Sequence, residues 1–352
     1  MSLAGRLYRG ETNFDLVGKR KRWYIISAVL VAICIASFFI RGFNFGIEFA
    51  GGNQFLVPAT SGATVSQVEA AVASAGVTTA GAPQEVGSGA TRQIHVRTPV
   101  ISVAKARDVK AAIANKLNMD PSRISDDAIS SAWGGDVTRK ALTGLLAFLV
   151  LVCVYIGFRF EPRMAIAAIV ALFHDVVIAA GIYSIVGFEV TPSTVVGFLT
   201  ILGYSLYDTV VVFDKVAENT KGLLGGARMT YSEAANLAVN QTFMRSINTS
   251  LVALLPVAGL LFVGAGLLGV GTLKDLALVL FVGLASGAYS SLFLATPILA
   301  DLKEREPPVA ALRQRVLAKR AGLASPATKR AGRPATAGRA AAQAPASTAV
   351  LE

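Results

Sequence analysis

The chain is poor in charged residues, cysteine and histidine, and these shortages exclude several kinds of site. Only 16% of its 352 residues are charged, against about 25% in soluble domains. Its two cysteines, Cys34 and Cys153, are too few for a disulfide framework, and we expect them to act as small hydrophobic residues. With two histidines and no His-Glu-x-x-His or Cys-x-x-Cys pattern, we expect no metal site and no cofactor. No Gly-x-x-x-x-Gly-Lys-Ser/Thr motif occurs, so ATP is not bound through a Walker A loop.

What the chain has instead is long apolar runs. Each of six runs approaches or exceeds the ~20 residues that a helix needs to cross ~30 Å of hydrocarbon. They cover residues 23–40, 141–158, 164–186, 192–213, 247–268 and 276–300. Buried helices of a large soluble protein are a poor alternative, because all six runs are long and nearly free of charge. The sequence therefore predicts an α-helical integral membrane protein with six transmembrane helices.

The placement of lysine and arginine predicts how these helices are oriented. Basic residues are frequent before the first run, after the second and fourth runs, and in the tail. The short loops after the third and fifth runs contain a single lysine between them. By the positive-inside rule, both termini are cytoplasmic. The net charge of +11 is then mainly a topology signal with some attraction to anionic membrane lipid, and we expect no nucleic-acid partner.

The runs divide the chain into five parts. Residues 1–22 are a basic cytoplasmic N-terminus, 23–40 the first helix, 41–140 an extracytoplasmic α+β domain, 141–300 helices two to six, and 301–352 a cytoplasmic tail. The tail is rich in alanine, proline and basic residues without apparent apolar periodicity. We therefore expect it to be disordered, because it cannot bury enough surface to offset its chain entropy.

Residues 41–140 carry patterns of both strands and helices. Alternating residues predict strands at 54–57, 93–97 and 128–133, and helical spacing predicts helices at 65–75 and 103–117. If residues 77–86 hold one more strand, the order becomes β-α-β-β-α-β. That order predicts a small ferredoxin-like α+β domain between the first and second membrane helices.

Two aspartates inside the apolar runs are the main candidate functional residues. Asp208 interrupts the fourth run, and Asp175, preceded by His174, interrupts the third. An ionisable group at such depth costs roughly 2.5–3.5 kcal/mol on insertion scales and usually marks an ion path, a relay or a catalytic centre. Desolvation raises a carboxyl pKa and a nearby cation lowers it, so a buried aspartate can be poised to load and release a proton. The alternative is an aspartate that only hydrogen-bonds a neighbouring helix.

Neighbouring residues suggest partners for these acids. Arg245, at the start of the fifth run, is the expected cationic partner of Asp208, unless it only anchors its helix at the headgroups. His174 and Asp175 point about 100° apart on a helix, so only one of them is expected to face a narrow path. His174 is therefore either a relay member or a structural histidine. The small residues Gly197, Gly203 and Ser205 predict close helix approach along the fourth run.

Several stretches, in order along the chain, resemble motifs of SecF proteins in the SecD/SecF family. They lie at residues 45–52, 174–176, 203–205, 208–216 and 240–250. A co-linear set of this length, within residues 15–300, is far more specific than one short pattern. The matched motif residues include Gly46, Glu48, Gly51, Gly52, Gly203, Ser205 and Thr209. Glu48 replaces the usual aspartate, and Tyr207 stands where asparagine is common, a change expected to alter the hydrogen bonding of Asp208.

The resemblance implies an RND-like half bundle in the bacterial cytoplasmic (inner) membrane. It further implies a subunit that pairs with a SecD-like subunit beside the SecYEG channel, with YajC as another partner and an unfolded preprotein as substrate. Such proteins use the proton-motive force to draw preproteins out on the outer side. By matched position, Asp208 and Arg245 form the proton-coupled pair, and we place Asp175 and His174 in the same relay. Whether protons or sodium ions couple is left open.

Three alternatives compete with this reading. An RND-type transporter of lipid or small molecules shares buried carboxylates, but usually has twice the spans and two large outer domains in one chain. An intramembrane protease is suggested by Gly203-Tyr204-Ser205, with His174 as base. The aspartyl version of that enzyme needs a second carboxylate in a Gly-x-Gly-Asp box, which is missing. A purely structural subunit predicts that neutralising the buried charges affects stability alone.

Overall fold

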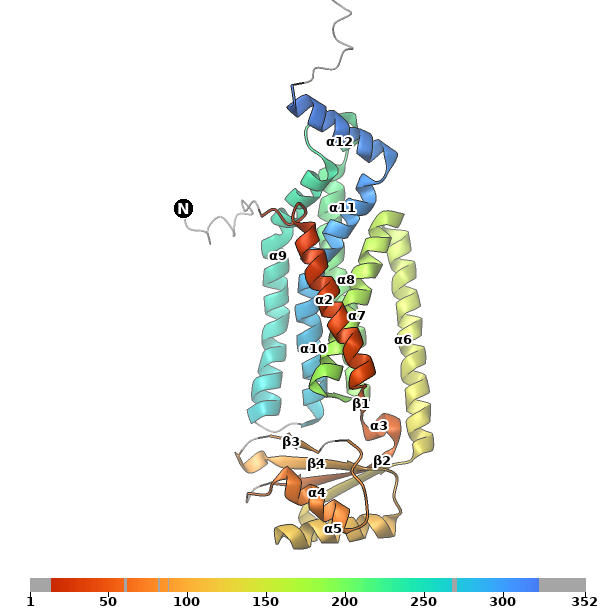
Figure 1. The fold of residues 1–352 in the computed structure, drawn as a ribbon, viewed down its shortest axis with the longest axis vertical. Helices are drawn as coiled ribbons and strands as arrows, with labels where there is room; N and C mark the ends of the chain where they lie inside the picture. Colours follow the sequence, from red (N-terminus) through yellow and green to blue (C-terminus); the bar gives the residue numbers. More distant parts are fainter. Residues whose placement is uncertain (1–13, 60–61, 82, 88, 268–270, 323–352) are drawn as a thin grey trace, which may run out of the picture.

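The computed structural model describes residues 14–59, 62–81, 83–87, 89–267 and 271–322 (Figure 1). Within these residues, six helical segments are long and apolar enough to cross a membrane, which confirms the predicted number of spans. Their main helices are α2 (Arg20–Ile40), α6 (Ser131–Arg159), α7 (Pro162–Val186), α8 (Pro192–Thr220), α9 (Tyr231–Gly259) and α10 (Gly271–Ser290). The fifth span continues as a π-helix, η4 (Leu260–Leu267), and the sixth as a π-helix, η5 (Ser291–Ala295), followed by α11 (Thr296–Glu304).

The helices run side by side, with a sheet domain at one end and α12 (Pro307–Arg320) at the other (Figure 1). The third, fourth and sixth spans are each about half buried, whereas the second span, α6, is 11% buried and lies at the edge of the bundle. The bundle core is therefore built from α7, α8 and α10. A proline at the first turn starts α7 and α8, and the capping box of Thr191 satisfies the first amides of α8.

Close packing in the core depends on glycines. A Cβ atom on Gly197 of α8 would overlap Val279 of α10, and one on Gly283 of α10 would overlap Ile201 of α8. Reciprocal glycines of this kind let two backbones approach within a membrane. The predicted contact role of Gly197 is thus confirmed. That of Gly203 is wrong, because Gly203 is exposed and a Cβ there would meet nothing within 4 Å.

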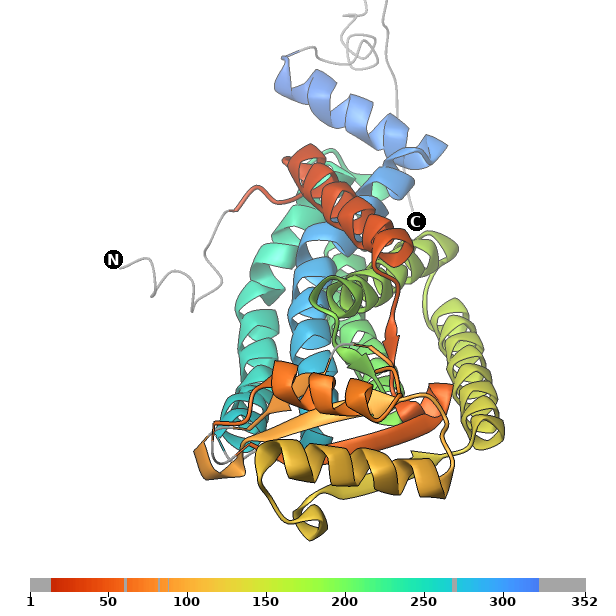
Figure 2. The same cartoon turned by 60° about the horizontal axis from the view of Figure 1, so that its bottom comes forward.

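The sheet domain has the predicted β-α-β-β-α-β order. Its elements are β2 (Gly52–Pro58), α4 (Val65–Ser74), β3 (Gln84–Val86), β4 (Gln93–Thr98), α5 (Val103–Leu117) and β5 (Ser125–Ile129), with short 3-10 turns at Gly89–Thr91 and Pro121–Arg123. The strands form an antiparallel sheet in the order β3-β4-β2-β5, as in ferredoxin-like folds. Helices α4 and α5 cover the face that points away from the bundle (Figures 1 and 2). Alternate strand residues such as Phe55, Val57, Ile94 and Val96 fill the core against them.

The last strand and the second span differ from their predicted bounds. The strand predicted at 128–133 ends at Ile129, and the helix predicted from 141 begins at Ser131. The cause is a helix cap, because the Ser130 hydroxyl accepts a hydrogen bond from the Trp133 amide at 3.3 Å. The ten residues before 141 therefore belong to α6, and the sheet domain joins this span with one residue between them.

The tail predicted to be disordered from 301 contains two helices, α11 and α12. Val309, Leu312 and Val316 are buried on one face of α12, at the spacing of an amphipathic helix. Arg320 at its end pairs with Glu233 at the start of α9. The prediction is wrong for residues 301–322, because three apolar side chains sufficed to dock an otherwise polar helix. Residues 323–352 lie outside the described part of the chain.

Candidate functional site

Asp208 lies in the bundle core at 3% exposure, and its described partners are serine hydroxyls. Ser246 of α9 donates to Oδ1 at 2.8 Å, and Ser291, the first residue of η5, donates to Oδ2. The predicted burial of this carboxyl is confirmed. Its position between three spans follows from α8, which packs on both α9 and α10.

Asp175 is even more enclosed, at 1% exposure. Ser205 of α8 donates to Oδ2 at 2.5 Å, Ser290 of α10 to the same oxygen at 2.7 Å, and Ser286 to Oδ1 at 2.9 Å. The glycine at 287 makes this possible, because a Cβ there would lie 3.0 Å from the Ser205 Cβ. Three hydroxyls from two neighbouring helices thus hold one carboxylate.

His174 lies beside Asp175 instead of apart from it. Its Nδ1 is 3.2 Å from Asp175 Oδ1, and its ring lies 6.0 Å from that of Tyr289 on α10. Its Nε2 is buried and has no hydrogen-bond partner among the described residues. Both residues of the pair are therefore buried in the bundle: Asp175 contacts the serines, and His174 packs on Tyr289 and hydrogen-bonds with Asp175.

Two expected contacts of Asp208 are absent from the described residues. Arg245 lies exposed on α9 and forms no ion pair with Asp208. Ser246, one residue later, faces inward instead, because consecutive helical side chains point about 100° apart. For the same reason Tyr207 points outward at 52% exposure and does not reach Asp208. The pairing predicted for Arg245 and the effect predicted for Tyr207 are both wrong in this conformation.

Ser205 and His174 do not form a nucleophile and its base. Each contacts Asp175, Ser205 through its hydroxyl proton and His174 through Nδ1. A serine nucleophile needs the imidazole to take the serine proton, whereas here the carboxylate holds it. The geometry therefore gives no support to the intramembrane-protease alternative.

The arrangement provides two enclosed carboxyl groups held by serine hydroxyls, with the His174 imidazole beside one of them. Within the described residues, no group of three or more histidine, cysteine, aspartate or glutamate side chains is placed to hold a metal ion. The site therefore offers carboxyl, hydroxyl and imidazole groups, which are able to hold and exchange protons.

Except for Thr209, the remaining motif residues lie at the junction with the sheet domain. The short helix α3 (Ile47–Ala50) ends at Gly51, and β2 starts at Gly52. Both glycines have positive φ, +73° and +140°, and a Cβ on Gly51 would lie 2.8 Å from the Ser131 Cα. The double glycine thus turns the chain from α3 into β2 directly against α6.

Glu48 presents a buried Oε2 with no partner in the described chain. Thr209 is buried beside Asp208 on α8.

A second link at this junction was missed from the sequence. Strand β1 (Asn44–Phe45) pairs in parallel with β6 (Glu189–Val190), the turn between α7 and α8. Arg97 of β4, at 5% exposure, donates to the Phe45 carbonyl at 2.8 Å, to Asn44 Oδ1 at 2.9 Å and to Glu189 Oε1 at 3.2 Å. Arg97 therefore fastens the sheet domain to the loop that leads into the Asp208 helix.

Burial shapes the electrostatics of this junction. It raises the pKa of Glu189, while Arg97 opposes that rise and Glu48 adds to it. Burial, with Lys274 and Arg97 nearby, lowers the pKa of His95 on β4 to about 4. Of these two groups, Glu189 takes part in the attachment of the sheet domain through Arg97, whereas His95 contacts Gln54 within the sheet.

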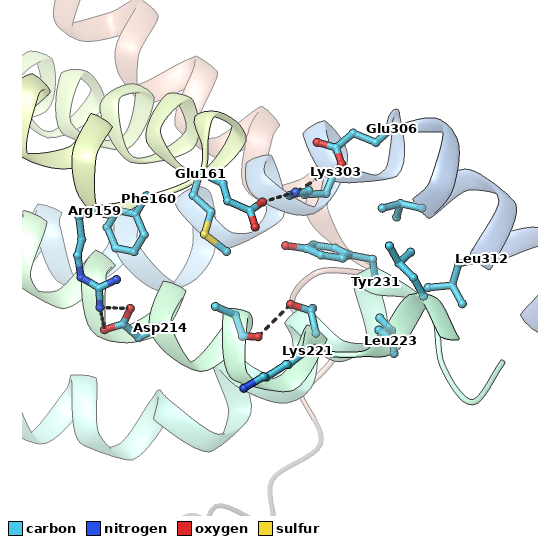
Figure 3. A pocket seen from close by; sticks show the side chains of 15 residues that line it. Arg159, Phe160, Glu161, Asp214, Lys221, Leu223, Tyr231, Lys303, Glu306 and Leu312 are labelled. Atoms are coloured by element: carbon cyan, nitrogen blue, oxygen red, sulfur yellow. Dashed lines mark hydrogen bonds and ion pairs between the residues drawn. The ribbon is translucent and has the colours of Figure 1, made fainter. Parts of the chain in front are cut away.

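At the opposite end of the bundle lies a cavity of about 380 Å³, lined by the α6–α7 turn, the end of α8 and α12 (Figure 3). Arg159 donates to both carboxylate oxygens of Asp214, at 2.8 and 2.9 Å, and Lys303 pairs with Glu161. The Tyr231 hydroxyl is buried without a partner among the described residues. Because most of its charged side chains are in ion pairs, this cavity does not resemble the carboxylate sites of the core.

Two segments of the chain match protein-family models. Residues 109–305 match the model described as "Protein export membrane protein SecD/SecF, C-terminal". Residues 36–63 match the "SecD/SecF GG Motif", which covers the double glycine at the junction. Together these segments include the second to sixth spans and the end of the first.

Similar proteins carry related names. "Protein translocase subunit SecF" of Streptomyces coelicolor is 49% identical over 320 residues, covering 91% of this chain and 85% of that protein. The protein of the same name from Mycobacterium tuberculosis strain H37Rv is 49% identical over 336 residues, covering 93% of this chain and 75% of that one.

A solved structure shows the same fold. The crystal structure of SecDF from Thermus thermophilus, described as a translocon-associated membrane protein, matches with a TM-score of 0.72 and 29% identity. The match covers 87% of this chain and 40% of that chain, so the present chain corresponds to less than half of SecDF.

Proposed function

Since the chain belongs to the SecD/SecF family of protein-export membrane proteins, we propose that it is the SecF subunit of a protein translocase. The support is the 49% identity to SecF proteins over nine tenths of the chain and the shared fold with SecDF. The rival function, transport of lipid or small molecules by an RND-type protein, is not favoured by any of these relatives.

The proposed partners follow from the same comparison. This chain covers 40% of SecDF, and we assign a SecD-type subunit as the partner that supplies the rest. The spans α2 and α6 are 17% and 11% buried, which leaves apolar faces for that subunit and for membrane lipid. By family resemblance we also propose the SecYEG channel, YajC and an unfolded preprotein as partners.

The proposed location is the bacterial cytoplasmic membrane, with both termini in the cytoplasm. The basic residues at the N-terminus, in the α6–α7 turn and in α12 support this orientation by the positive-inside rule. The sheet domain then lies on the outer side, where a preprotein emerges.

We assign proton coupling to Asp208, with Asp175, His174 and Arg245 in the same relay. The observation that carries this assignment is the burial of both aspartates among serine hydroxyls. A turn of α9 by about 100° exchanges Ser246 for Arg245 beside Asp208, which makes Arg245 the cation of a second state. Moving one charge through 100 mV is worth about 2.3 kcal/mol. That energy shifts a two-state helix arrangement some fifty-fold but does not rebuild a fold.

The test uses the full chain with its SecD-type partner and the SecYEG channel in membrane vesicles. The measurement is the fraction of a preprotein whose export depends on the proton-motive force. We expect Asp208→Asn to abolish that fraction, and Asp214→Asn, six residues along the same helix but exposed and paired with Arg159, to keep it. Equal export by both variants refutes the coupling role, and failure to co-purify with a SecD-type subunit refutes the SecF assignment.

A further inference from the structure

Two consecutive serines connect the buried carboxylates. Ser290, the last residue of α10, donates to Asp175 at 2.7 Å, and Ser291, the first residue of η5, donates to Asp208. Both serines are fully buried. The two acids come from different spans, so this serine pair is a direct covalent connection between their hydrogen-bond shells.

Each of these hydroxyls has a second acceptor. Ser290 Oγ also lies 3.2 Å from the Gly287 carbonyl, and Ser291 Oγ lies 3.3 Å from the Ala288 carbonyl. A hydroxyl has a single proton to donate. Each serine therefore divides its proton between a carboxylate on another helix and a carbonyl three residues earlier on its own helix.

The backbone at this point is not a regular α-helix. α10 changes at Ser291 into the π-helix η5, and it returns to α-helix at Thr296. Single π turns inside α-helices occur frequently at functional sites. Gly287, which precedes this turn on α10, has no side chain and therefore lets the helix approach Ser205 of α8 closely. A rotation here moves both serines together, because they are neighbours on one chain.

We propose that Ser290 and Ser291 are positioning residues that couple the protonation of Asp175 to the protonation of Asp208. This inference rests on the proposed function, in which these aspartates bind protons. Protonating Asp175 removes the charge that attracts the Ser290 proton, and the hydroxyl turns to the Gly287 carbonyl. The turn of η5 that follows withdraws Ser291 from Asp208. With one donor fewer, the charged form of Asp208 is less well held, so Asp208 takes up its own proton more readily.

The coupling has the opposite sign from direct repulsion between two carboxylates. A negative charge on Asp175 acting through space favours a proton on Asp208, so neutralising Asp175 makes Asp208 harder to protonate. Through the serine pair, neutralising Asp175 makes Asp208 easier to protonate. The sign alone therefore distinguishes the two routes.

Other ionisable groups near the two acids form a constant background. On the elements packed around them these are His174 on α7, Tyr204 and Tyr207 on α8, Tyr289 on α10 and the exposed Arg245 on α9. None of these side chains is changed in the variants below.

The experiment follows the protonation of Asp208 by infrared difference spectroscopy on the full chain with its SecD-type partner in liposomes. The carboxylic acid band of Asp208 is assigned by its loss in Asp208→Asn. We expect Asp175→Asn to raise the pH midpoint of this band by about one pH unit, the size of one hydrogen bond to a charged group. In the Ser290→Ala and Ser291→Ala backgrounds, Asp175→Asn should raise it no further.

Ser246→Ala is the matched control, because it removes a donor from Asp208 through α9 and leaves the serine pair intact. It should raise the midpoint itself and still show the full effect of Asp175→Asn. If Ser290→Ala or Ser291→Ala does not assemble with the partner, cysteine at the same position replaces alanine. Its thiol fills the space of the serine side chain but is a weaker hydrogen-bond donor, so the coupling should be partly lost.

Three results overturn the inference: Asp175→Asn lowers the Asp208 midpoint, leaves it unchanged, or raises it equally with and without the serines. In all three, Asp208 still titrates and the proposed function stands. An Asp208 band that never changes between pH values overturns the proposed function as well.

Discussion

Removing Arg97 is expected to loosen the sheet domain from the bundle at one defined place. Arg97 is buried and bridges Asn44, Phe45 and Glu189 with three hydrogen bonds. Its alanine variant leaves the largely buried Glu189 carboxyl without its cation. The β1–β6 pairing, which lies directly beside it, should then open more often.

The expected size of this effect comes from the cost of an unpaired buried charge. Removing one partner of a buried ion pair destabilises the paired structure by about 3–5 kcal/mol. A loss of about 3 kcal/mol raises the open fraction of the β1–β6 pairing by more than about 100-fold. Arg92, five residues earlier, offers a matched control, because its pair with Glu85 is about one-third exposed on each side. An exposed pair contributes roughly 0–1 kcal/mol, at most about five-fold in opening.

Amide hydrogen exchange measures this opening in the intact protein. The Gly46 amide donates to the Val190 carbonyl at 2.9 Å across the two strands, and it should exchange more than about 100-fold faster in Arg97→Ala. Arg92→Ala should change it at most about five-fold. Adding Glu189→Ala to Arg97→Ala should restore part of the protection, since no buried charge is then left alone. Equal exchange in the Arg97 and Arg92 variants refutes the reasoning.

Three further predictions concern stability. Because the pKa of His95 is lowered to about 4 from its ordinary 6.5, the unfolded chain binds a proton that the folded one does not. The free energy of unfolding should therefore fall by about 2–3 kcal/mol as pH drops from 6.5 to 4, and His95→Gln should flatten this fall in urea unfolding curves. Gly134→Ala places a Cβ 2.7 Å from the Phe49 carbonyl oxygen and should lower the thermal unfolding midpoint. At Gly135 a Cβ meets nothing within 4 Å, so Gly135→Ala should leave that midpoint unchanged or raise it. Leu312→Ala in α12 should cost about 2–5 kcal/mol and speed tryptic cleavage there, while half-exposed Leu317→Ala should not; equal cleavage contradicts the docked helix.

Much of the fold is encoded in local patterns and could be predicted from them. The six spans follow from length and hydrophobicity, and α5 begins and ends at the predicted residues, Val103 and Leu117. The predictions failed where one residue decides between two structures. Ser130 caps a helix in a stretch whose alternation suggested a strand, and α12 is held by few apolar residues in an alanine-rich segment.

The candidate site was predictable only in its acids. Asp175 and Asp208 stand out because charge is rare in a membrane span, and both are buried as expected. Their partners are not local: Ser291 is 83 positions from Asp208, and Ser290 is 115 from Asp175. A serine is common enough in an apolar helix to carry no signal by itself, so only the packing of α7 and α8 against the sixth span reveals the contacts. Arg97 lies in an ordinary strand pattern and was equally hidden.

The direct passage from β5 into α6 has a mechanical consequence. With a single residue between them, the sheet and this rod of 29 residues, about 43 Å long, tilt as one piece. A tilt of the sheet domain therefore moves the far end of α6, at the opposite end of the bundle, without a flexible joint to absorb it.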